Sequence, residues 1–467
     1  MSASKRQKES PPQGAIKTLI MGAAGFDYHC FNMVFRNDPG HNVVAFSFCE
    51  EQNLGTDEGG ESARKYPPDL AGPLYPNGIP FIPEKNLADF VKKNEVKLVV
   101  FAYSDISHEE LMHRASIALA TGADFKLVSP SRHQIKSTKP VLSICAVRTG
   151  VGKSSVARAA VRFFQNRGKR VVGVREPMPY GDLSRQTVMR FATYEDLALS
   201  KCTIEEREEY EPYVSQNMII YSGVDYEKVL RKAEEESDVI IWDGGNNEVS
   251  FFESDLLCVL ADPLRPGHEK RYHPGECNCR LADCFIVAKC HEASETAITS
   301  VEQTLRTLQP DAEIVRVASV TRLENPADEA LLKGKTVIVV DDGPTLTHGN
   351  AAFGAGFVMA RKLGLQIVDP RTHASGSYKK IFHEFPHLES CVPAMGYTDE
   401  QIQDLADTLN RSSAEIVING SPSDLKQLLG DKLKKPVYRV LYDVGPIGGS
   451  KKTLEQVFEE FAKKHGL

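Results

Sequence analysis

The stretch LSICAVRTGVGKSSVARAA, residues 142–160, decides the fold of the central part of the chain. An apolar run ends in a glycine-containing turn, and Lys153, Ser154 and a helical pattern follow. Backbone amides of such a turn at the start of a helix point toward a bound anion, and the helix dipole adds attraction. Gly150 and Gly152 let the backbone approach that anion closely because they lack a Cβ. The stretch therefore predicts a phosphate-binding loop between a strand and a helix.

This loop differs from the pattern GxxxxGK[ST] at its first glycine, whose place Val147 takes. RTGVGKS instead matches a deviant form, xKGGxGK[ST], with Arg148 where one branch of these proteins often has an additional lysine. Dimers are common in that branch and the cation acts across them, so we expect a homodimer and a catalytic Arg148. Lys153 is expected to contact the β and γ phosphates, and the Ser154 hydroxyl to bind Mg²⁺. The predicted nucleotide-binding residues are Thr149, Gly150, Val151, Gly152, Lys153, Ser154 and Ser155. The structural alternative is an unrelated strand–turn–helix that contains a Gly-Lys pair.

The composition of the whole chain limits its class. Its 467 residues are 41% hydrophobic and 25% charged, and the net charge is −7. These values are typical of a globular protein, and they argue against a general nucleic-acid binder, which needs a basic face. No apolar run is long enough to span a bilayer. Ten cysteines without a signal peptide favour reduced thiols, so we expect a cytoplasmic protein with no nucleic-acid or membrane partner.

Short apolar runs alternate with amphipathic stretches, which predicts an α/β fold with parallel strands. Residues 1–14 are polar and are expected to form a disordered tail. Residues 15–135 are predicted to form a Rossmann-like α/β domain, and residues 136–325 a P-loop NTPase domain with a mostly parallel sheet. Residues 326–467 are predicted to form a C-terminal α/β domain.

Polar residues at the ends of two further predicted strands extend the phosphate site. Asp243 follows the apolar run of DVIIWDGGNNE and is expected to hold Mg²⁺ together with Ser154. Arg175 and Asp182 flank a proline-rich turn, where Arg175 can bind an anion through two hydrogen bonds. The alternatives are a solvated turn at Asp243 and a rigid structural loop after Arg175. The predicted catalytic residues are Lys153, Asp243, Arg148 and Arg175, and the predicted metal ligands are Ser154 and Asp243.

Long motifs elsewhere in the chain occur together in a recognisable order. They are GAAGFDYHCFN, FAYSDISH, CAVRTGVGKS, VREPMPYGDL, IEEREEYEPY, WDGGNNE, DPLRPGHEKRYHPGE, DDGPTLTHG and PAMGY. On these motifs the chain resembles the cyclic 2,3-diphosphoglycerate synthetase-like family, also described as predicted GTPases, from about residue 16 to the C-terminus. The resemblance implies a P-loop enzyme in which ATP drives closure of a phosphoanhydride within 2,3-bisphosphoglycerate.

Such a reaction needs positive groups and Mg²⁺ around a polyanion. The predicted substrate-binding residues are Arg175, Asp182, Asn246, Arg265, His268, Arg271, His273, Asp342 and His348. Four of them lie in DPLRPGHEKRYHPGE, and two lie in DDGPTLTHG after an apolar strand. The alternatives are a solvated surface loop for the first segment and a capped helix start for the second.

The nucleotide base is predicted from a missing motif. The resemblance implies an NKxD-like element after the strand CFIVAK, but residues 288–291 read Ala-Lys-Cys-His. The carboxylate that would accept hydrogen bonds from guanine is absent, which favours ATP over GTP. The cysteines at 277, 279, 284 and 290 do not follow a standard zinc spacing, so no metal is assigned to them.

We therefore predict an ATP-dependent, Mg²⁺-requiring enzyme that activates a phosphate or carboxylate of a small anionic metabolite. The alternative is a nucleotide-dependent switch or maturation factor with slow hydrolysis, as in other members of this P-loop branch. Three predicted α/β domains with clefts between them, and polar loops at several strand ends, favour the enzyme.

Overall fold

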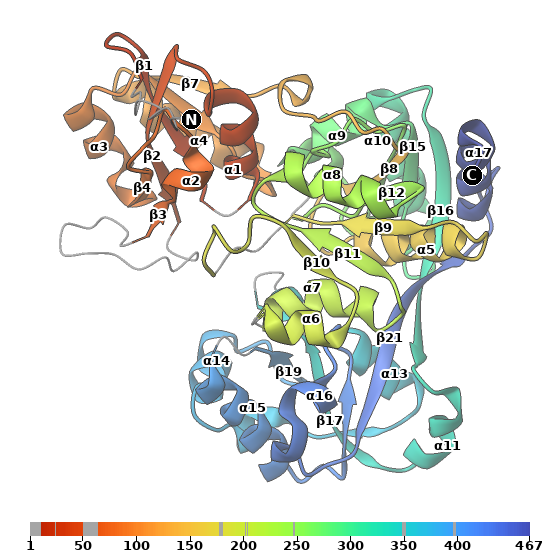
Figure 1. Cartoon of the computed structure of the whole chain (residues 1–467). Helices are drawn as coiled ribbons and strands as arrows, with labels where there is room; N and C mark the ends of the chain where they lie inside the picture. The colour runs from red at the N-terminus through yellow and green to blue at the C-terminus, as the bar shows by residue number, and fades with distance from the viewer. Residues whose placement is uncertain are drawn as a thin grey trace, which may run out of the picture. The chain divides into compact units, whose positions relative to one another are not determined.

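The computed structural model of the chain describes residues 11–23, 25–49, 64–176, 181–200, 202, 204–245, 248–347, 352–395 and 398–467. The chain divides into two units (Figure 1). Unit 1 comprises residues 1–190, 221–316 and 448–467, and unit 2 comprises residues 191–220 and 317–447. Both units combine mostly parallel strands with helices, which confirms the predicted α/β class.

A six-stranded sheet forms the first part of unit 1. Its order is β3 (Lys65–Tyr66), β4 (Ile79–Pro83), β2 (His41–Phe48), β1 (Ile16–Met21), β5 (Leu98–Phe101) and β7 (Asp124–Leu127). The β3–β4 pair is antiparallel and the other pairs are parallel. The helices of this part include α1 (Phe26–Cys30), α3 (Leu87–Asn94) and α4 (His108–Ala120).

Both faces of this sheet are buried, as a parallel sheet requires. Leu19 and Met21 of β1 belong to one apolar cluster, whereas Ile20 between them belongs to another. The neighbouring strand β2 repeats the pattern with Ala45 and Phe46. Because successive side chains of a strand point to opposite faces, near-continuous apolar runs in these strands fill two separate cores.

The second sheet of unit 1 carries the glycine loop. Its parallel strands follow the order β9 (Val171–Val174), β12 (Val239–Trp242), β8 (Val141–Ala146), β13 (Leu256–Ala261), β15 (Cys284–Val287) and the start of β16 (Glu313–Leu323). Its helices include α5 (Lys153–Gln165), α8 (Tyr226–Glu236), α9 (Gly275–Leu281) and α10 (Glu295–Leu308). Since these strands run the same way, the loops that follow them meet at one edge of the sheet, where open α/β sheets bind ligands.

The last helix, α17 (Leu454–His465), returns to unit 1. It begins at a capping box with Thr453 as N-cap. The ring of Phe458 packs edge-on against Phe163 of α5, with 5.5 Å between centroids. Residues 448–467, which the sequence placed in the C-terminal domain, therefore join unit 1 through aromatic packing on the helix of the glycine loop.

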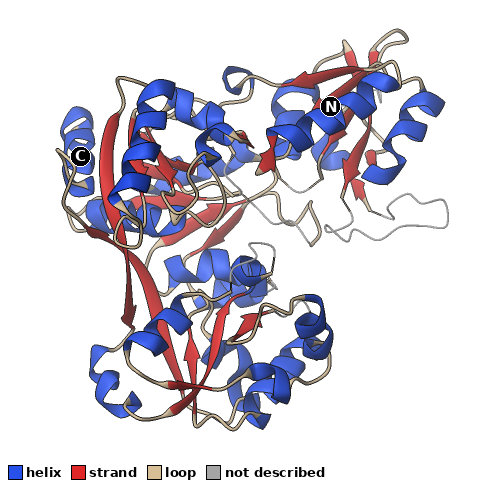
Figure 2. Ribbon diagram, turned by 180° about the vertical axis from the view of Figure 1, so that it is seen from behind, coloured by secondary structure: helices blue, strands red, loops and turns tan. Residues whose placement is uncertain are grey.

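Unit 2 is built on mostly parallel strands of its own. Its strands are β17 (Thr336–Asp342), β18 (Gln366–Ile367), β19 (Cys391–Ala394), β20 (Ile416–Asn419) and β21 (Val437–Pro446), which also pairs antiparallel with β16. Its helices include α6 (Tyr194–Leu199), α7 (Ile204–Val214), α12 (Gly343–Leu346), α13 (Ala355–Lys362), α14 (Tyr378–Glu384), α15 (Asp399–Arg411) and α16 (Leu425–Leu429). Helices flank the strands (Figure 2), so the centre of β17 is buried on both faces.

The chain passes between the units within secondary structure elements. It enters unit 2 in β10 (Met189–Phe191), returns in β11 (Ile219–Ser222), and enters again along β16. The longest helix that the structure describes, α10, has 14 residues. None of the described helices has the length and apolar character needed to cross a membrane.

Candidate active site

The glycine loop joins β8 to α5 at the carboxyl edge of the second sheet of unit 1. Gly150 and Gly152 have φ angles of 78° and 108°, a backbone conformation that favours glycine. Gly152 is the N-cap of α5, which begins at Lys153. The N–H groups of the first helical turn therefore lack helical partners and can bind an anion, as the sequence pattern predicts.

Lys153 lies over the end of β12. Its ammonium group donates hydrogen bonds to the backbone carbonyl of Asp243, to Asp243 Oδ1 at 3.2 Å, and to the carbonyl of Gly244 at 3.3 Å. Asp243 is fully buried and Lys153 is 8% exposed, so solvent screens this ion pair little. The buried carboxylate thus holds the lysine ammonium beside the glycine loop.

Arg175, directly after β9, connects the loop to the same carboxylate. Its Nη1 donates to Ser154 Oγ at 2.9 Å and to Asp243 Oδ2 at 3.1 Å. The hydroxyl of Tyr226 donates to the carbonyl of Arg175 and fixes the backbone at this point. A positive nitrogen therefore lies between the two oxygens that the sequence predicts as Mg²⁺ ligands.

Two more cations hold the loop through its carbonyl oxygens. Lys289 Nζ donates to the carbonyl of Gly150 at 2.7 Å, and Arg265 Nη2 donates to the carbonyl of Thr149 at 3.0 Å. Both side chains also bind Oδ2 of the buried Asp262, at 3.0 Å from Lys289 and 3.1 Å from Arg265. Arg265, which the sequence assigns to the substrate, therefore positions the glycine loop in this structure.

Arg148 is held by contacts within its own chain. Its guanidinium lies 4.2 Å from the centroid of the Tyr272 ring, a cation–π contact. Its Nε lies 3.8 Å from Oδ1 of Asp105, which also accepts a hydrogen bond from the backbone N–H of Thr149 at 3.4 Å. Burial raises the pKa of Asp105 above its usual value. These contacts hold the guanidinium of Arg148 against Tyr272 and Asp105.

Two carboxyl groups meet next to this network. Glu176 follows Arg175 and forms a hydrogen bond with Glu248, whose Oε1 accepts from the hydroxyl of Ser104 at 2.6 Å. The Oε2 atom of Glu248 accepts from the backbone N–H of Gly245 at 2.9 Å. Burial, and then the charge of Glu248, raise the pKa of Glu176 well above its usual value. Burial and the neighbouring carboxyl group therefore favour the neutral form of Glu176.

The histidines of the loop after β13 differ from the expected positive groups. Burial, followed by the charges of Arg265 and other arginines, lowers the pKa of His268. His273 lies in β14 (Tyr272–His273), which pairs with β6 (Ile106–Ser107), and burial lowers its pKa to about 4. Both imidazoles are neutral at pH 7, because water does not stabilise their charged forms here. Arg271 accepts a backbone hydrogen bond at 2.8 Å from the first residue of α4.

The remaining predicted substrate residues do not join this network. Asp182 is exposed, and its Oδ1 accepts from a backbone N–H two residues later at 3.0 Å. Asp342 lies in unit 2 and caps α12, because its Oδ2 accepts from the backbone N–H of Thr345 at 3.2 Å. This is the capped helix start considered as the alternative. Asn246 and His348 lie outside the described residues.

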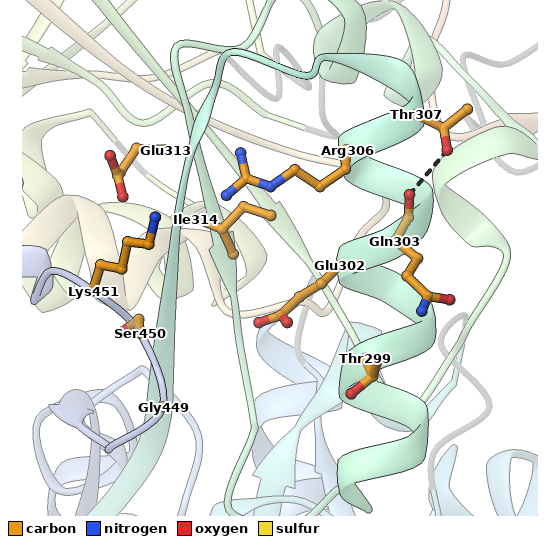
Figure 3. Close-up of a pocket in the computed structure, with 10 residues that line it drawn as sticks. All are labelled: Thr299, Glu302, Gln303, Arg306, Thr307, Glu313, Ile314, Gly449, Ser450 and Lys451. Atoms are coloured by element: carbon orange, nitrogen blue, oxygen red, sulfur yellow. Dashed lines mark hydrogen bonds between the residues drawn. The ribbon is translucent and has the colours of Figure 1, made fainter.

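A pocket of about 560 Å³ opens elsewhere in unit 1, between α10, the start of β16 and the segment before α17 (Figure 3). Its lining residues are Thr299, Glu302, Gln303, Arg306, Thr307, Glu313, Ile314, Gly449, Ser450 and Lys451. Its acidic groups are paired within the protein: Glu302 accepts from Arg316 at 2.7 Å, and Glu313 lies 3.6 Å from Lys452. This pairing leaves no evident reacting group, so the glycine loop remains the candidate site.

A parallel α/β sheet, a glycine loop before α5, and Lys153 and Asp243 at neighbouring strand ends define a P-loop protein. No family model matches the sequence. The arginine synthetase ArcE of Thermococcus kodakarensis is 49% identical over 448 residues, which are 96% of this chain and 97% of that protein. The chain therefore belongs to the family of this arginine synthetase.

Two solved structures show weaker likeness. LpxK from Aquifex aeolicus, in complex with ATP, has a TM-score of 0.42 and 14% identity, over 71% of this chain and 90% of that chain. Cobyrinic acid a,c-diamide synthase from Mycobacterium smegmatis, with an ATP analog and magnesium, has a TM-score of 0.19 and 12% identity, over 39% and 72%. Since both TM-scores are below 0.5, these likenesses carry no argument about function.

Sequence reasoning missed several residues of the network. Asp262 follows an apolar strand, in the same way as Asp243, so its position was a usable signal. Lys289 stands in the sequence where the base-binding motif is missing, and nothing local indicates that it contacts the glycine loop. Glu176 stands beside Arg175 in the sequence, but nothing local indicates that it meets Glu248.

Proposed function

We propose that this chain is an ATP-dependent arginine synthetase. The observation that carries the proposal is its 49% identity to a protein of that name across nearly the full length of both chains. The glycine loop, with Lys153 and Arg175 beside it, supports phosphate binding. The absence of an NKxD element in the sequence favours ATP over GTP.

Mg²⁺ fits the oxygen pair of Ser154 and Asp243. Both are hard oxygen donors of the kind that Mg²⁺ prefers, and the positive Arg175 nitrogen that binds both of them supports a cation at this position. Mg²⁺ held there by Ser154 and Asp243 would neutralise phosphate charge. The phosphate oxygens of ATP would compete with the Asp243 carboxylate for Lys153 and Arg175. These two side chains would then bind the β and γ phosphates.

The acceptor follows from the structure of arginine. A guanidinium group differs from a ureido group by one nitrogen in place of oxygen. Transfer of the γ-phosphoryl group to the ureido oxygen breaks the Pγ–O bond of ATP and makes that oxygen part of a phosphate leaving group. An amine nitrogen then attacks the carbon, the C–O bond breaks, and phosphate leaves. With ammonium as the nitrogen source, citrulline and ATP give arginine, ADP and phosphate.

The carboxyl groups of Glu176 and Glu248 suit the proton transfers of this reaction. The attacking nitrogen must lose a proton, and Glu248, which is held by the hydroxyl of Ser104 and by a backbone N–H, is a carboxyl group placed to accept one. Glu176, whose neutral form is favoured, is an acid beside it. This arrangement supports a reaction that needs both a proton acceptor and a proton donor near the glycine loop.

The test is arginine formation by the purified full-length chain with Mg²⁺, ATP, citrulline and ammonium chloride. Parallel reactions replace ammonium with aspartate or glutamine, ATP with GTP, and citrulline with 2,3-bisphosphoglycerate, the acceptor that the motif resemblance implies. Chromatography measures arginine and, in the aspartate reaction, the N-substituted guanidine that the aspartate nitrogen would form, and ³¹P NMR measures ADP, phosphate and any cyclic phosphoanhydride. We expect equimolar arginine and phosphate, dependent on Mg²⁺ and faster with ATP than with GTP.

Two variants make this test specific. Lys153→Ala removes the phosphate-binding ammonium and is expected to lower turnover at least a hundredfold. Lys92→Met changes an exposed lysine of α3 and is expected to keep wild-type turnover. A chain that makes neither arginine nor a substituted guanidine from any nitrogen donor, and that hydrolyses ATP slowly whether or not an acceptor is present, is a switch rather than a synthetase.

A further inference from the structure

The strand β7 forms one edge of the first sheet of unit 1. It is the last strand of that sheet, so its outer side pairs with no strand among the described residues. The backbone N–H of Asp124 donates to the carbonyl of Lys97, the residue before β5, at 2.9 Å. Because the backbone groups of a strand alternate in direction, those of Phe125 and Leu127 face away from β5. These groups are available to pair with another strand.

Helix α4, which packs against β7 (Figure 1), carries exposed apolar side chains beside this edge. Met112 and Leu119 are 56% and 54% exposed, and their spacing of seven residues places them on one side of the helix. On the other side Arg114 binds Glu84, which directly follows β4, at 2.8 Å. Since β4 lies on the inner side of the sheet order, Met112 and Leu119 face the free edge.

The side chains of β7 divide between the two faces of the sheet. Phe125 packs on the apolar cluster that contains Leu111 of α4, so Phe125 and Leu127 lie on the α4 face. Leu127 is 44% exposed and, together with Met112 and Leu119, forms an apolar stripe along the edge. Asp124 and Lys126 lie on the opposite face.

A second copy of this chain fits the edge, because the charges of β7 are complementary to themselves. In an antiparallel pair with a two-fold axis at Phe125, Phe125 faces its own copy, and Asp124 of each chain faces Lys126 of the other. The outward backbone groups of Phe125 then form a hydrogen-bonded pair, as the alternation of antiparallel pairs requires. Two opposite-charge pairs form on one face, and the two apolar stripes meet on the other.

We propose that β7 and α4 form the interface of a symmetric dimer, in which the β7 strands of two copies pair antiparallel. The proposal does not rest on the proposed function. The deviant glycine loop also implies a dimer, with Arg148 acting across it, but β7 and α4 are a different surface. Dimer formation through this surface requires neither ATP nor turnover.

The test measures the mass of the full-length chain by sedimentation velocity over a range of protein concentrations, without nucleotide and at low ionic strength. We expect a reversible equilibrium between monomer and dimer. Hydrogen–deuterium exchange at high and low protein concentration locates the interface. The backbone N–H groups of Phe125 and Leu127 are expected to exchange more slowly in the dimer, because they donate to the second copy.

Charge reversal tests the register of the two strands. Lys126→Asp places carboxylates opposite each other, and Asp124→Lys places ammonium groups opposite each other. Each variant alone is expected to raise the dissociation constant of the dimer at least tenfold. An equimolar mixture of the two variants restores both opposite-charge pairs, so it is expected to form heterodimers about as tightly as the wild type. Neither side chain is buried, so both variants are expected to fold.

The apolar stripe is tested on α4. Leu119→Ser removes an apolar side chain from the interface and is expected to raise the dissociation constant about fivefold. Ile117→Ser is the matched control, because Ile117 is also exposed on α4 but lies on another face of the helix. This control is expected to keep the wild-type dissociation constant and fold.

Several outcomes would overturn the proposal. They are a monomer at every concentration, a dimer whose protected amides lie outside residues 108–127, unchanged dissociation constants in both charge variants, and a mixture of these variants that stays monomeric. Heterodimers in the mixture, with each variant monomeric alone, establish the pairing of Asp124 with Lys126. Arginine formation measured on the same preparation tests the proposed function separately.

Discussion

Lys289 Nζ and the carbonyl oxygen of Gly150 lie 2.7 Å apart, although 139 residues separate them in the chain. The same ammonium group binds the buried Asp262 at 3.0 Å. In this way a residue after β15 fixes the turn of the glycine loop after β8. At the position where a guanine-binding NKxD element was expected, the chain thus keeps a lysine that supports phosphate binding.

Lys289→Met is predicted to loosen this loop without unfolding unit 1. The methionine retains an apolar stem but removes the donor to Gly150, so the turn is less well ordered for phosphate. We expect the KM for ATP to rise about tenfold, because one charge-assisted hydrogen bond to the loop is lost. The thermal midpoint is expected to change only slightly. Steady-state kinetics measure this change, with Lys92→Met as the control. An unchanged KM would mean that Lys289 does not position the loop.

Replacing Arg175 is predicted to raise metal affinity and to lower turnover. Its Nη1 contacts Ser154 Oγ and Asp243 Oδ2, the oxygens proposed to hold Mg²⁺. Arg175→Gln removes a positive charge from that position, so the nucleotide-free chain should bind divalent metal more tightly, by several-fold. Turnover should fall at least tenfold, because a phosphate-binding cation is lost. Mn²⁺ titration followed by electron paramagnetic resonance measures the first effect. Weaker metal binding in Arg175→Gln would contradict the proposed metal position.

Local sequence pattern was enough to predict the glycine loop. Its signal lies in consecutive residues: an apolar strand, glycines where φ is positive, and Lys153 at the start of α5. Asp243 was also predictable, since it follows an apolar run as a polar residue at a strand end. The glycine loop and the polar residue at a strand end depend on neighbouring residues in the sequence, so local pattern predicts them.

Gly25 is predicted to be required by the close approach of Glu176. A Cβ at Gly25 would lie 2.1 Å from Glu176 Oε1, well inside van der Waals contact. Gly25→Ala should therefore lower the free energy of unfolding by about 1–3 kcal/mol through overpacking. Combining it with Glu176→Ala removes the opposing atoms, so the two effects should not add. Urea denaturation of both single variants and the double variant measures this coupling.

The control for this cycle is Gly448→Ala, because a Cβ there meets nothing within 4 Å. Its effect on the free energy of unfolding should stay within about 0.5 kcal/mol. If the effects of Gly25→Ala and Glu176→Ala simply add, the two residues do not pack as the structure indicates.

Long-range contacts and the division into units could not be predicted in this way. Residues 191–220 lie in sequence between β9 and β12, but they belong to unit 2. Their buried Glu208 meets Ser421, a partner 213 residues away. The sequence pattern of α7 predicts only that a helix forms. Which residue packs against a charged side chain such as Glu208 depends on the tertiary structure. His273 shows the same limit, since only tertiary packing buries its imidazole and lowers its pKa to about 4.

His133 is predicted to make unit 1 sensitive to acid. Its side chain is buried against Phe26 and Phe251, and burial lowers its pKa to about 4. In the unfolded chain the imidazole takes up a proton near pH 6.5, whereas in the folded chain it does not until about pH 4. The unfolded state binds more protons in this window, so stability falls as the pH falls. Between pH 7.5 and pH 5 this one group should lower the free energy of unfolding by about 2 kcal/mol.

His133→Phe removes that contribution, because it keeps an aromatic ring in the apolar site and removes the titrating group, together with the effect of its charge on the pKa of the neighbouring His29. Glu176 and Glu208, whose pKa values are raised by burial, act in the opposite direction and are present in both proteins, so their effects cancel in the comparison. Urea denaturation at pH 7.5 and pH 5 should show a loss about 2 kcal/mol smaller in His133→Phe than in the wild type. His113→Gln, an exposed histidine of α4, should follow the wild type. Equal losses in His133→Phe and the wild type would show that His133 can be protonated in the folded chain, and that its burial does not hold it neutral.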